Sequence, residues 1–316
     1  MRRKSLTRKI IYRYIAMICT AVLLTGCGSS AKEEVSVNVE KTSNGEVRSN
    51  EPICLVPTAA GTTVIGDDKV SVDISNASEG YFYVTYSGDN TDVKMQIICN
   101  GGITYTYKIS VGDTVVPLTQ GSGEYQIIVY EGMGNGQYSV LFAENATIDI
   151  TNEFGAFLYP NYYVDFTDQS EAVAKGSELA ASCTCDLEVI GAVYDYVIGN
   201  IAYDHDEAEN VGSDYVPDVD EILDTKKGIC FDYASLMSAM LRSQRIPTKL
   251  EIGYAGDAYH AWVTTYVQDI GWINGIIQFD GTEWTLMDPT FAANADAKTL
   301  KKFVGDGSNY TTKYEY

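Results

Sequence analysis

Short runs of alternating apolar and polar residues fill the chain between Lys69 and Ile150. Glycine-rich turns such as Asn100-Gly101-Gly102 and Gly121-Ser122-Gly123 separate these runs. A period of two residues is typical of strands with one buried face, and regularly spaced turns are typical of antiparallel sheets. The pattern therefore predicts an antiparallel β-sandwich domain over residues 51–150. Its expected strands cover residues 70–74, 81–86, 93–98, 104–109, 125–130 and 138–142.

Tyrosines recur at alternate positions along these predicted strands. Such a set usually packs the faces of a sheet, because aromatic side chains suit a pleated, half-buried surface. Exposed rings can also form a surface that binds carbohydrate or protein. Both interpretations stay open for residues 51–150.

From Thr151 onward the alternation gives way to helical periodicity. Apolar residues at positions i, i+3, i+4 and i+7 in residues 187–200 predict an amphipathic helix. Strand-like runs return only near the end of the chain, and this mixture predicts an α+β domain over residues 151–316. Its expected helices cover residues 170–181, 187–200 and 217–224 and a run that starts near Cys230 and stops before Pro247, and its expected strands cover 260–267 and 284–290.

Residues 1–26 have the pattern of a secretory signal peptide. Six basic residues and no acidic ones precede the apolar run Ile15–Leu24, whereas a membrane span needs about 20 apolar residues. Leu24-Thr25-Gly26-Cys27 then resembles a bacterial lipobox, which implies a lipid on Cys27 and a protein anchored outside the cell membrane. Residues 27–50 lack the apolar content to fold and predict a flexible tether. Ordinary secretion is the alternative to the lipid anchor.

Charge limits the kind of partner that the chain can bind. The formal net charge is −21, and removal of residues 1–26 takes away six positive charges, which gives −27. So acidic a surface repels phosphate groups, and this argues against nucleic acid and anionic membrane surfaces as partners.

Three residue types used in nucleophilic catalysis follow one another in the C-terminal part. Cys230 is expected at a helix N-terminus, where unpaired N–H groups and the helix dipole favour a thiolate. His260, one of only two histidines, opens a predicted strand, and Asp288 ends another. They are the parts of a nucleophile, a base and a group that orients the base. A small core residue is the alternative for Cys230, and the other histidine, His205, is expected to be a solvated surface residue.

Five short motifs lie around these residues. They are Gly228-Ile229-Cys230-Phe231-Asp232-Tyr233-Ala234, Arg245-Ile246-Pro247-Thr248, Gly253-Tyr254, Tyr259-His260-Ala261-Trp262 and Met287-Asp288-Pro289-Thr290-Phe291. Together they resemble the bacterial transglutaminase-like superfamily, part of the papain-like cysteine fold group. The resemblance implies a papain-like core with a catalytic triad of Cys230, His260 and Asp288. It also implies that Asp232 fixes local structure through hydrogen bonds.

The resemblance implies a cell-surface enzyme that acts on amide bonds through a thioester on Cys230. Its substrate would be a protein or peptide, with cell-wall peptide among the options. Attack of water on the thioester would make it a peptidase or amidase, and attack of a lysine amine would make it a cross-linking acyltransferase. Neither a metal nor an organic cofactor is implied. A non-catalytic binding or adhesion protein that keeps the fold is the alternative, and the oligomeric state, the second oxyanion donor and the disulfide pairing stay open.

Overall fold

The computed structural model describes five stretches of the chain. They are residues 48–268, 271–274, 276–279, 284–287 and 310–316. Cys27, the predicted signal peptide and the predicted tether up to residue 47 lie outside them, and so does Asp288. Among the helices of the described stretches, none combines the length and the apolar character that a membrane crossing requires.

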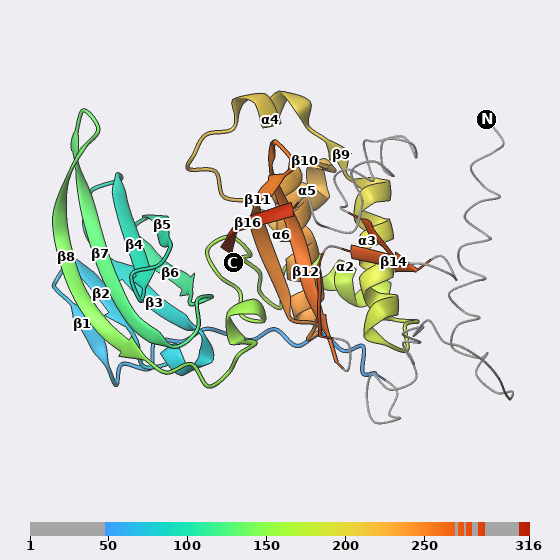
Figure 1. Ribbon diagram of the computed structural model, residues 1–316, viewed down its shortest axis with the longest axis horizontal. Helices are drawn as coiled ribbons and strands as arrows, with labels where there is room; N and C mark the ends of the chain where they lie inside the picture. Colours follow the sequence, from blue (N-terminus) through green and yellow to red (C-terminus); the bar gives the residue numbers. More distant parts are fainter. Residues whose placement is uncertain (1–47, 269–270, 275, 280–283, 288–309) are drawn as a thin grey trace, which may run out of the picture.

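The N-terminal unit consists of two four-stranded antiparallel sheets (Figure 1). The strand order is β1-β2-β3-β6 in one sheet and β5-β4-β7-β8 in the other. In chain order the strands are β1 (Val64–Gly66), β2 (Val70–Asp73), β3 (Tyr81–Tyr86), β4 (Val93–Cys99), β5 (Thr104–Ile109), β6 (Gly112–Pro117), β7 (Gly123–Gly134) and β8 (Gln137–Ile148). Short 3₁₀ turns, Ala77–Glu79 and Gly155–Phe157, stand before β3 and after β8.

Alternation along each strand decides which face is buried. Every second residue from Val93 to Cys99 of β4 is buried, and the residues between them are half-buried. Phe82 of β3 meets Tyr125 of β7 edge to face, with ring centroids 5.8 Å apart, so the buried faces of the two sheets share one core. The predicted antiparallel sheets are therefore present, and their classification as a β-sandwich stays a prediction.

Each of the six predicted strands falls within an observed strand or one residue beyond it. The pattern missed β1 and β6. β6 begins with Gly112 and Asp113, two poor strand formers, yet it pairs with β3 along its whole length. Pairing with β3 therefore defines β6, and the strand propensity of its first residues does not predict it.

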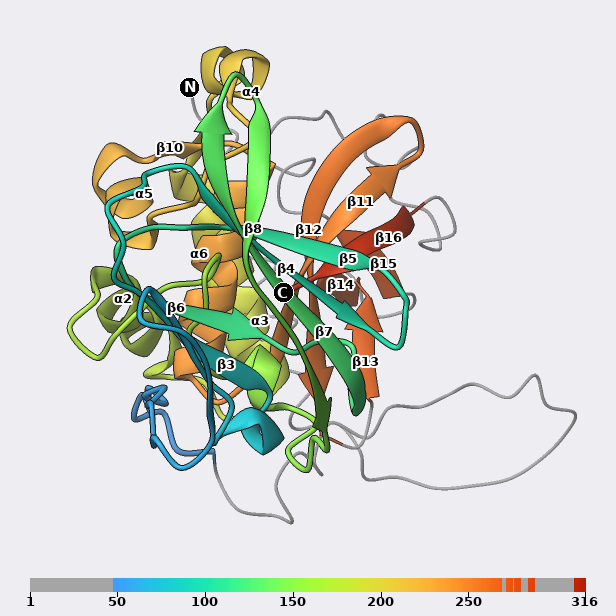
Figure 2. The ribbon, with the colours of Figure 1, turned by 90° about the vertical axis from the view of Figure 1, so that its left-hand side faces the viewer.

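The C-terminal unit is a mixed α and β structure, as predicted. It places helices against an antiparallel sheet of order β13-β12-β11-β16, and Figure 2 shows β16 alongside β11. Two small pairs accompany it, β9 with β10 in parallel and β14 with β15 antiparallel. The elements are α2 (Glu171–Ala180), α3 (Asp186–Asn200), β9 (Ala202–Tyr203), α4 (His205–Asn210), α5 (Val219–Thr225), β10 (Lys227–Gly228), α6 (Cys230–Ser243), β11 (Thr248–Ala255), β12 (Ala258–Val267), β13 (Gly271–Asn274), β14 (Ile276–Phe279), β15 (Trp284–Met287) and β16 (Tyr310–Glu315).

Helix α6 is the centre of this unit. Every residue from Asp232 to Ser243 is buried, because α2, α3 and α5 pack against one side of the helix and β11 and β12 against the other. Gly176 of α2 permits close contact, since a Cβ there would lie 3.1 Å from the carbonyl oxygen of Met240. A helix enclosed in this way must find partners inside the protein for the polar groups at its ends.

Asp232 supplies that partner at the start of α6. Its Oδ2 accepts a hydrogen bond from the Ile229 backbone N–H at 2.7 Å, and its Oδ1 accepts one from the Tyr215 hydroxyl at 2.8 Å. Gly228 makes room, because a Cβ there would lie 2.6 Å from the Asp232 Cβ. The predicted local structural role of Asp232 is thus confirmed. Burial raises the pKa of this carboxyl group from 3.8 to about 6.

Near the other end of α6, Arg242 binds neighbouring segments to the helix. It is fully buried, and its guanidinium donates to the backbone carbonyl groups of Thr248, Tyr159 and Tyr316 at 2.8–3.0 Å. Burial lowers the pKa of this group to about 9. One side chain therefore fixes α6, β11, the residue that follows β16 and the segment after β8 relative to one another.

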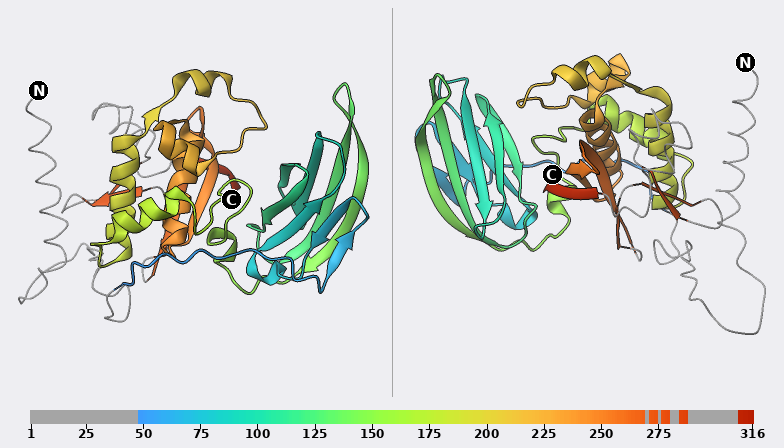
Figure 3. Two further views of the ribbon diagram at one scale, coloured as in Figure 1. Left: turned by 180° about the vertical axis from the view of Figure 1, so that it is seen from behind. Right: turned by 45° about the horizontal axis from the view of Figure 1, so that its top comes forward.

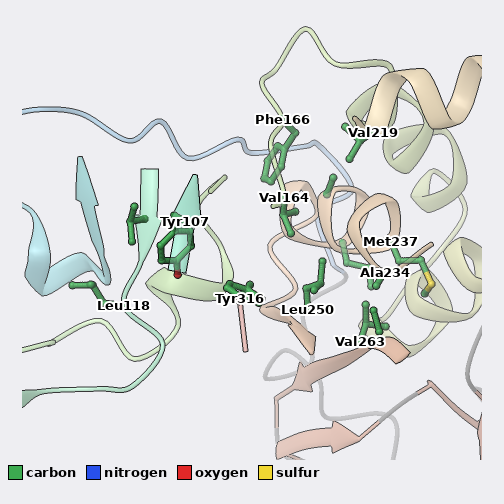
Figure 4. Packing of buried hydrophobic residues seen from close by; sticks show 14 of the residues in the cluster. Tyr107, Leu118, Val164, Phe166, Val219, Ala234, Met237, Leu250, Val263 and Tyr316 are labelled. Atoms are coloured by element: carbon green, nitrogen blue, oxygen red, sulfur yellow. The ribbon is translucent and has the colours of Figure 1, made fainter. Parts of the chain in front are cut away.

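The two units share one hydrophobic core. Figure 4 shows Tyr107 of β5 beside Tyr316 at the end of the chain, and the ring centroids are 6.2 Å apart. Tyr105 contacts the rings of Tyr314 and Tyr316, and its hydroxyl accepts a hydrogen bond from the Glu315 N–H at 3.2 Å. Figure 3 shows from behind that this end of the chain lies between the units. Each unit consequently completes the buried surface of the other.

Residues 48–53 form a second link, since they lie along the C-terminal unit before the chain enters the first sheet. Arg48 forms an ion pair with Asp186 at the start of α3. The Ile53 N–H donates to the Ser243 carbonyl at 2.8 Å, and the Arg245 guanidinium donates to the Glu51 carbonyl at 3.0 Å. The end of the predicted tether is therefore fixed against α3 and α6.

We predict that removal of the Tyr107 hydroxyl stabilises the protein. The side chain is fully buried, and no described residue forms a hydrogen bond with its oxygen. A buried polar group without a partner costs about 1–3 kcal/mol. Tyr107→Phe should therefore raise the free energy of unfolding, measured by urea titration, by about 1 kcal/mol. The matched variant Tyr105→Phe should lower it by about 1 kcal/mol, because it loses a hydrogen bond. Equal losses in both variants would contradict this account of the interface.

The raised pKa of Asp232 predicts a pH dependence of stability. The folded pKa of about 6 exceeds the ordinary value of 3.8, so the folded state holds a proton that the unfolded state has lost. The stability contribution is therefore complete below pH 3.8 and is lost as the pH rises through about 6, by up to about 3 kcal/mol. Asp232→Asn, which keeps an acceptor for the Ile229 N–H, should remove this decrease.

The measurement compares urea unfolding of the parent and Asp232→Asn at pH 4 and pH 7.5. Asp206→Asn, on the exposed face of α4, serves as control and should parallel the parent. A stability difference between Asp232→Asn and the parent that is identical at both pH values would show that the carboxyl group is not protonated in the folded state.

Candidate active site

Cys230 occupies the first position of α6, the one end of the helix that is not fully buried. The residue before it, Ile229, has extended backbone angles (φ −93°, ψ −178°), and the helix begins with Cys230. Cys230 itself is half-buried rather than enclosed in the core. The predicted position at a helix N-terminus is thus confirmed. Backbone N–H groups here have no partner within the helix, and the positive end of the helix dipole favours a thiolate or an oxyanion.

The short parallel pair β9–β10 holds the segment in front of Cys230. The Ala202 N–H donates to the Lys226 carbonyl at 2.8 Å, and the Asp204 N–H donates to the Gly228 carbonyl at 3.0 Å. Lys227 forms an ion pair with the Asp204 carboxylate at 3.5 Å. The positive end of α6 supplies positive potential at Cys230 that does not depend on this exposed ion pair.

His260 lies on β12, opposite Gly253 of β11, and is buried. Its ring is nearly parallel to that of Trp262, with an interplanar angle of 25° and centroids 6.3 Å apart. Gly253 is required because β16 comes close at this point: a Cβ there would lie 2.0 Å from the Thr311 carbonyl oxygen. The histidine is thus held in a tightly packed region of the sheet.

A buried carboxyl group fixes the orientation of Trp262. Glu251 of β11 accepts hydrogen bonds from the Trp262 Nε1–H at 2.5 Å and the Thr264 hydroxyl at 2.6 Å. Burial raises the pKa of Glu251. Trp262 therefore belongs to the apolar wall behind His260. Sequence reasoning missed Glu251, although a charged residue inside the apolar alternation of residues 248–255 was a usable signal.

Helix α6, which begins with Cys230, packs against β12, the strand that carries His260. Burial is the largest cause that raises the pKa of the Tyr259 phenol, and the Cys230 thiol is among the smaller ones. Tyr259, the neighbour of His260, therefore lies within electrostatic range of the thiol. Asp288, the third candidate, lies outside the described residues, and β15 before it ends at Met287.

Aromatic side chains surround the start of α6. The ring centroid of Phe231 lies 5.2 Å from that of Tyr163 and 6.5 Å from that of Tyr215. On the strands that pack against α6, Tyr254 of β11 and Tyr259 of β12 are exposed, and their ring centroids are 5.4 Å apart. Tyr259 is thus open to a substrate. The contacts of Tyr163 and Tyr215 with α6 link distant parts of the chain, and no motif predicted them.

The remaining candidates have no place at this site. His205 is exposed at the start of α4, as predicted, although the expected acidic loop is a short helix capped by Asp204. The five cysteines of the described residues form no disulfide. Within the same part of the chain, no cluster of histidine, cysteine and carboxylate side chains could hold a metal ion.

One family model and one relative match parts of this chain. The family model of the transglutaminase-like superfamily matches residues 174–275, a range that contains Cys230 and His260 and ends before Asp288. The chain is also 25% identical over 213 residues to UPF0252 protein MJ1282 of Methanocaldococcus jannaschii. That match covers 60% of this chain and 57% of the relative, so the chain spans less than two thirds of the relative's length.

Two solved structures match this chain with low TM-scores. One is a protein from Cytophaga hutchinsonii proposed to be a cysteine protease, with a TM-score of 0.32 and 15% identity, over 67% of this chain and 74% of that one. The other is red sea bream transglutaminase, with a TM-score of 0.27 and 14% identity, over 68% of this chain and 49% of that one. The match to the family model includes α6 and β12, so residues 174–275 form a transglutaminase-like domain within the C-terminal unit.

Proposed function

We propose that this protein is a cysteine enzyme that acts on amide bonds of proteins or peptides through a thioester on Cys230. The observation that carries the proposal is the position of Cys230 at the first residue of α6, against the strand that bears His260. A helix start supplies positive potential for the thiolate, and the buried His260, on the strand that packs against this helix, supplies a base. The family match of residues 174–275 supports the same chemistry.

The reaction begins when His260 accepts the proton of the Cys230 thiol. The thiolate attacks the amide carbonyl carbon, and the backbone N–H of Cys230 donates to the oxyanion that forms. The C–N bond then breaks, His260 returns the proton to the leaving amine, and the acyl group stays on sulfur. Water or an amine finally attacks the thioester, which releases the acyl group and restores the thiol. Asp288 holds the imidazole in the correct orientation.

The final acceptor separates a hydrolase from a cross-linking acyltransferase. Both products come from one acyl-enzyme, and the acceptor that reaches the thioester determines which one forms. The exposed Tyr259 borders the position where this acceptor would approach. We therefore propose cysteine acyl transfer as the function, with water and primary amines as its two acceptors.

The same proposal includes a location. A short apolar run followed by Leu24-Thr25-Gly26-Cys27 supports lipid attachment to Cys27 and an anchor on the outer face of the cell membrane. The enzyme would then act on extracellular or cell-wall peptides.

Substitution of Cys230 tests the mechanism most directly. The parent, incubated with a glutamine-containing peptide, should gain the mass of the acyl group in an intact-mass measurement. Cys230→Ala should lose this adduct completely, because the nucleophile is absent. Cys54→Ala, which removes a half-buried thiol elsewhere, should keep the adduct.

His260→Ala should lower the acylation rate by about 10²–10⁴-fold through loss of the base, whereas His205→Ala on the exposed helix α4 should match the parent. Equal acylation of the parent and Cys230→Ala would end the proposal.

The anchor has a test of its own. Cys27→Ala should remain an uncleaved precursor or leave the membrane without lipid. Cys19→Ala changes a cysteine inside the apolar run and should still give a lipidated mature protein. The measurement is the mass of the N-terminal peptide in the membrane fraction. Lipid on the Cys27→Ala protein would refute the assignment.

A further inference from the structure

Two neighbouring residues of β5, in the N-terminal unit, reach the start of α6 by separate routes. In the first route, the Lys108 ammonium forms an ion pair with the Asp214 carboxylate at 2.9 Å. The next residue, Tyr215, donates its hydroxyl to the buried Asp232 carboxylate at 2.8 Å. The loop between α4 and α5 therefore connects the sheet of one unit to the catalytic helix of the other.

The second route is aromatic. The ring of Tyr107 lies 6.1 Å from Tyr163, and Tyr163 lies 5.2 Å from Phe231. These separations are typical of interacting aromatic pairs. The fully buried Tyr107 makes this route insensitive to solvent, whereas the Lys108 ion pair is partly exposed.

Both routes end on the first turn of α6. Phe231 and Asp232 are its second and third residues, immediately after Cys230. Asp232 also holds the Ile229 N–H, on the other side of the cysteine, at 2.7 Å. The peptide groups before and after Cys230 are thus fixed by side chains whose own positions depend on β5.

We propose that the N-terminal unit controls the reactivity of Cys230, and that Tyr215 is the positioning residue through which it acts. This inference rests on the proposed function, because it assumes that Cys230 is the nucleophile. Tyr215 does not touch the substrate. It holds Asp232, and Asp232 holds the backbone that aims the Cys230 thiol and N–H at the same carbonyl group. Lys108 fixes the loop that carries Tyr215.

The consequences differ for binding and for reaction. Misplacement of the nucleophile and the oxyanion donor affects the transition state, so kcat falls while KM stays nearly constant. Loss of the Tyr215 hydroxyl also changes the protonation of Asp232. Its neighbours are the Tyr215 hydroxyl and the Ile229 N–H, which lower its pKa, and Glu207 of α4 and Glu221 of α5, which raise it. Loss of the Tyr215 donor therefore raises the pKa of Asp232 above about 6.

The experiment measures the rate of alkylation of Cys230 by iodoacetamide, from pH 5 to pH 9, in the full mature chain. The labelled peptide is identified by mass, so reaction at other cysteines does not interfere, and no turnover is needed. Tyr215→Phe should lower the alkylation rate and kcat by about tenfold, keep KM within about twofold and move the inflection near pH 6 to higher pH. Tyr196→Phe, a half-buried tyrosine of α3, is the matched control.

The charge pair tests the link to the N-terminal unit. Lys108→Glu should lower the rate by about threefold, as expected for a partly exposed pair, and Lys108→Glu combined with Asp214→Lys should restore it. Lys69→Met breaks an ion pair with Glu131 inside the N-terminal unit and should have no effect. These variants change only partly or largely exposed residues, so they test the control of Cys230 by the N-terminal unit even if Tyr215→Phe fails to fold.

Two negative results have different meanings. A parent Cys230 that reacts no faster than the buried Cys183 would refute the proposed function together with this inference. A reactive parent with unchanged rates in Tyr215→Phe, or no recovery in the charge-swapped double variant, would refute the inference alone.

Discussion

The enclosure of α6 is the constraint on which the rest of the structure depends. A helix buried from its third residue to its last cannot rely on water to pair its terminal polar groups, so the protein must supply partners at both ends. Asp232 does so at the start, where it accepts the Ile229 N–H, and at the other end the N–H groups of Arg245 and Ile53 donate to the carbonyl groups of Arg242 and Ser243. The first two residues of the helix, Cys230 and Phe231, are half-buried, so rigidity and access coincide at this end.

The same constraint explains why the two units depend on each other. Arg242 needs the Tyr316 carbonyl, and Tyr316 packs against tyrosines of β5. The helix that carries the candidate nucleophile is thus completed by the end of the chain, which in turn is covered by the N-terminal unit. Division of the chain near residue 151 is clear in the periodicity, but the buried surface continues across it. Periodicity reports local structure, and a shared core depends on contacts between distant residues.

Sequence reasoning succeeded where the physics is local. Alternation located β3 and β5, and helix signals placed the start of α6 at Cys230, because side-chain period and chain punctuation depend on neighbouring residues. It missed β6, which is defined by its pairing with β3. It also missed Tyr215, whose partner Asp232 lies on a different element. Lys108 and Asp214 are 106 positions apart, and no spacing rule joins them. The candidate residues Cys230 and His260 were therefore predictable, and the side chains that hold their surroundings were not.

The two routes from β5 differ in their physical character, and this difference suggests different roles. The contact of Tyr107 with Tyr163 is apolar and buried, so salt and pH hardly affect it. The ion pair of Lys108 and Asp214 is partly exposed, so counterions weaken it. Lys94 of β4, which is paired with Lys108 in the sheet, adds a second positive charge close to Asp214. The aromatic route would then set the basic position of the first turn of α6, and the charged route would adjust it with the ionic strength of the surroundings.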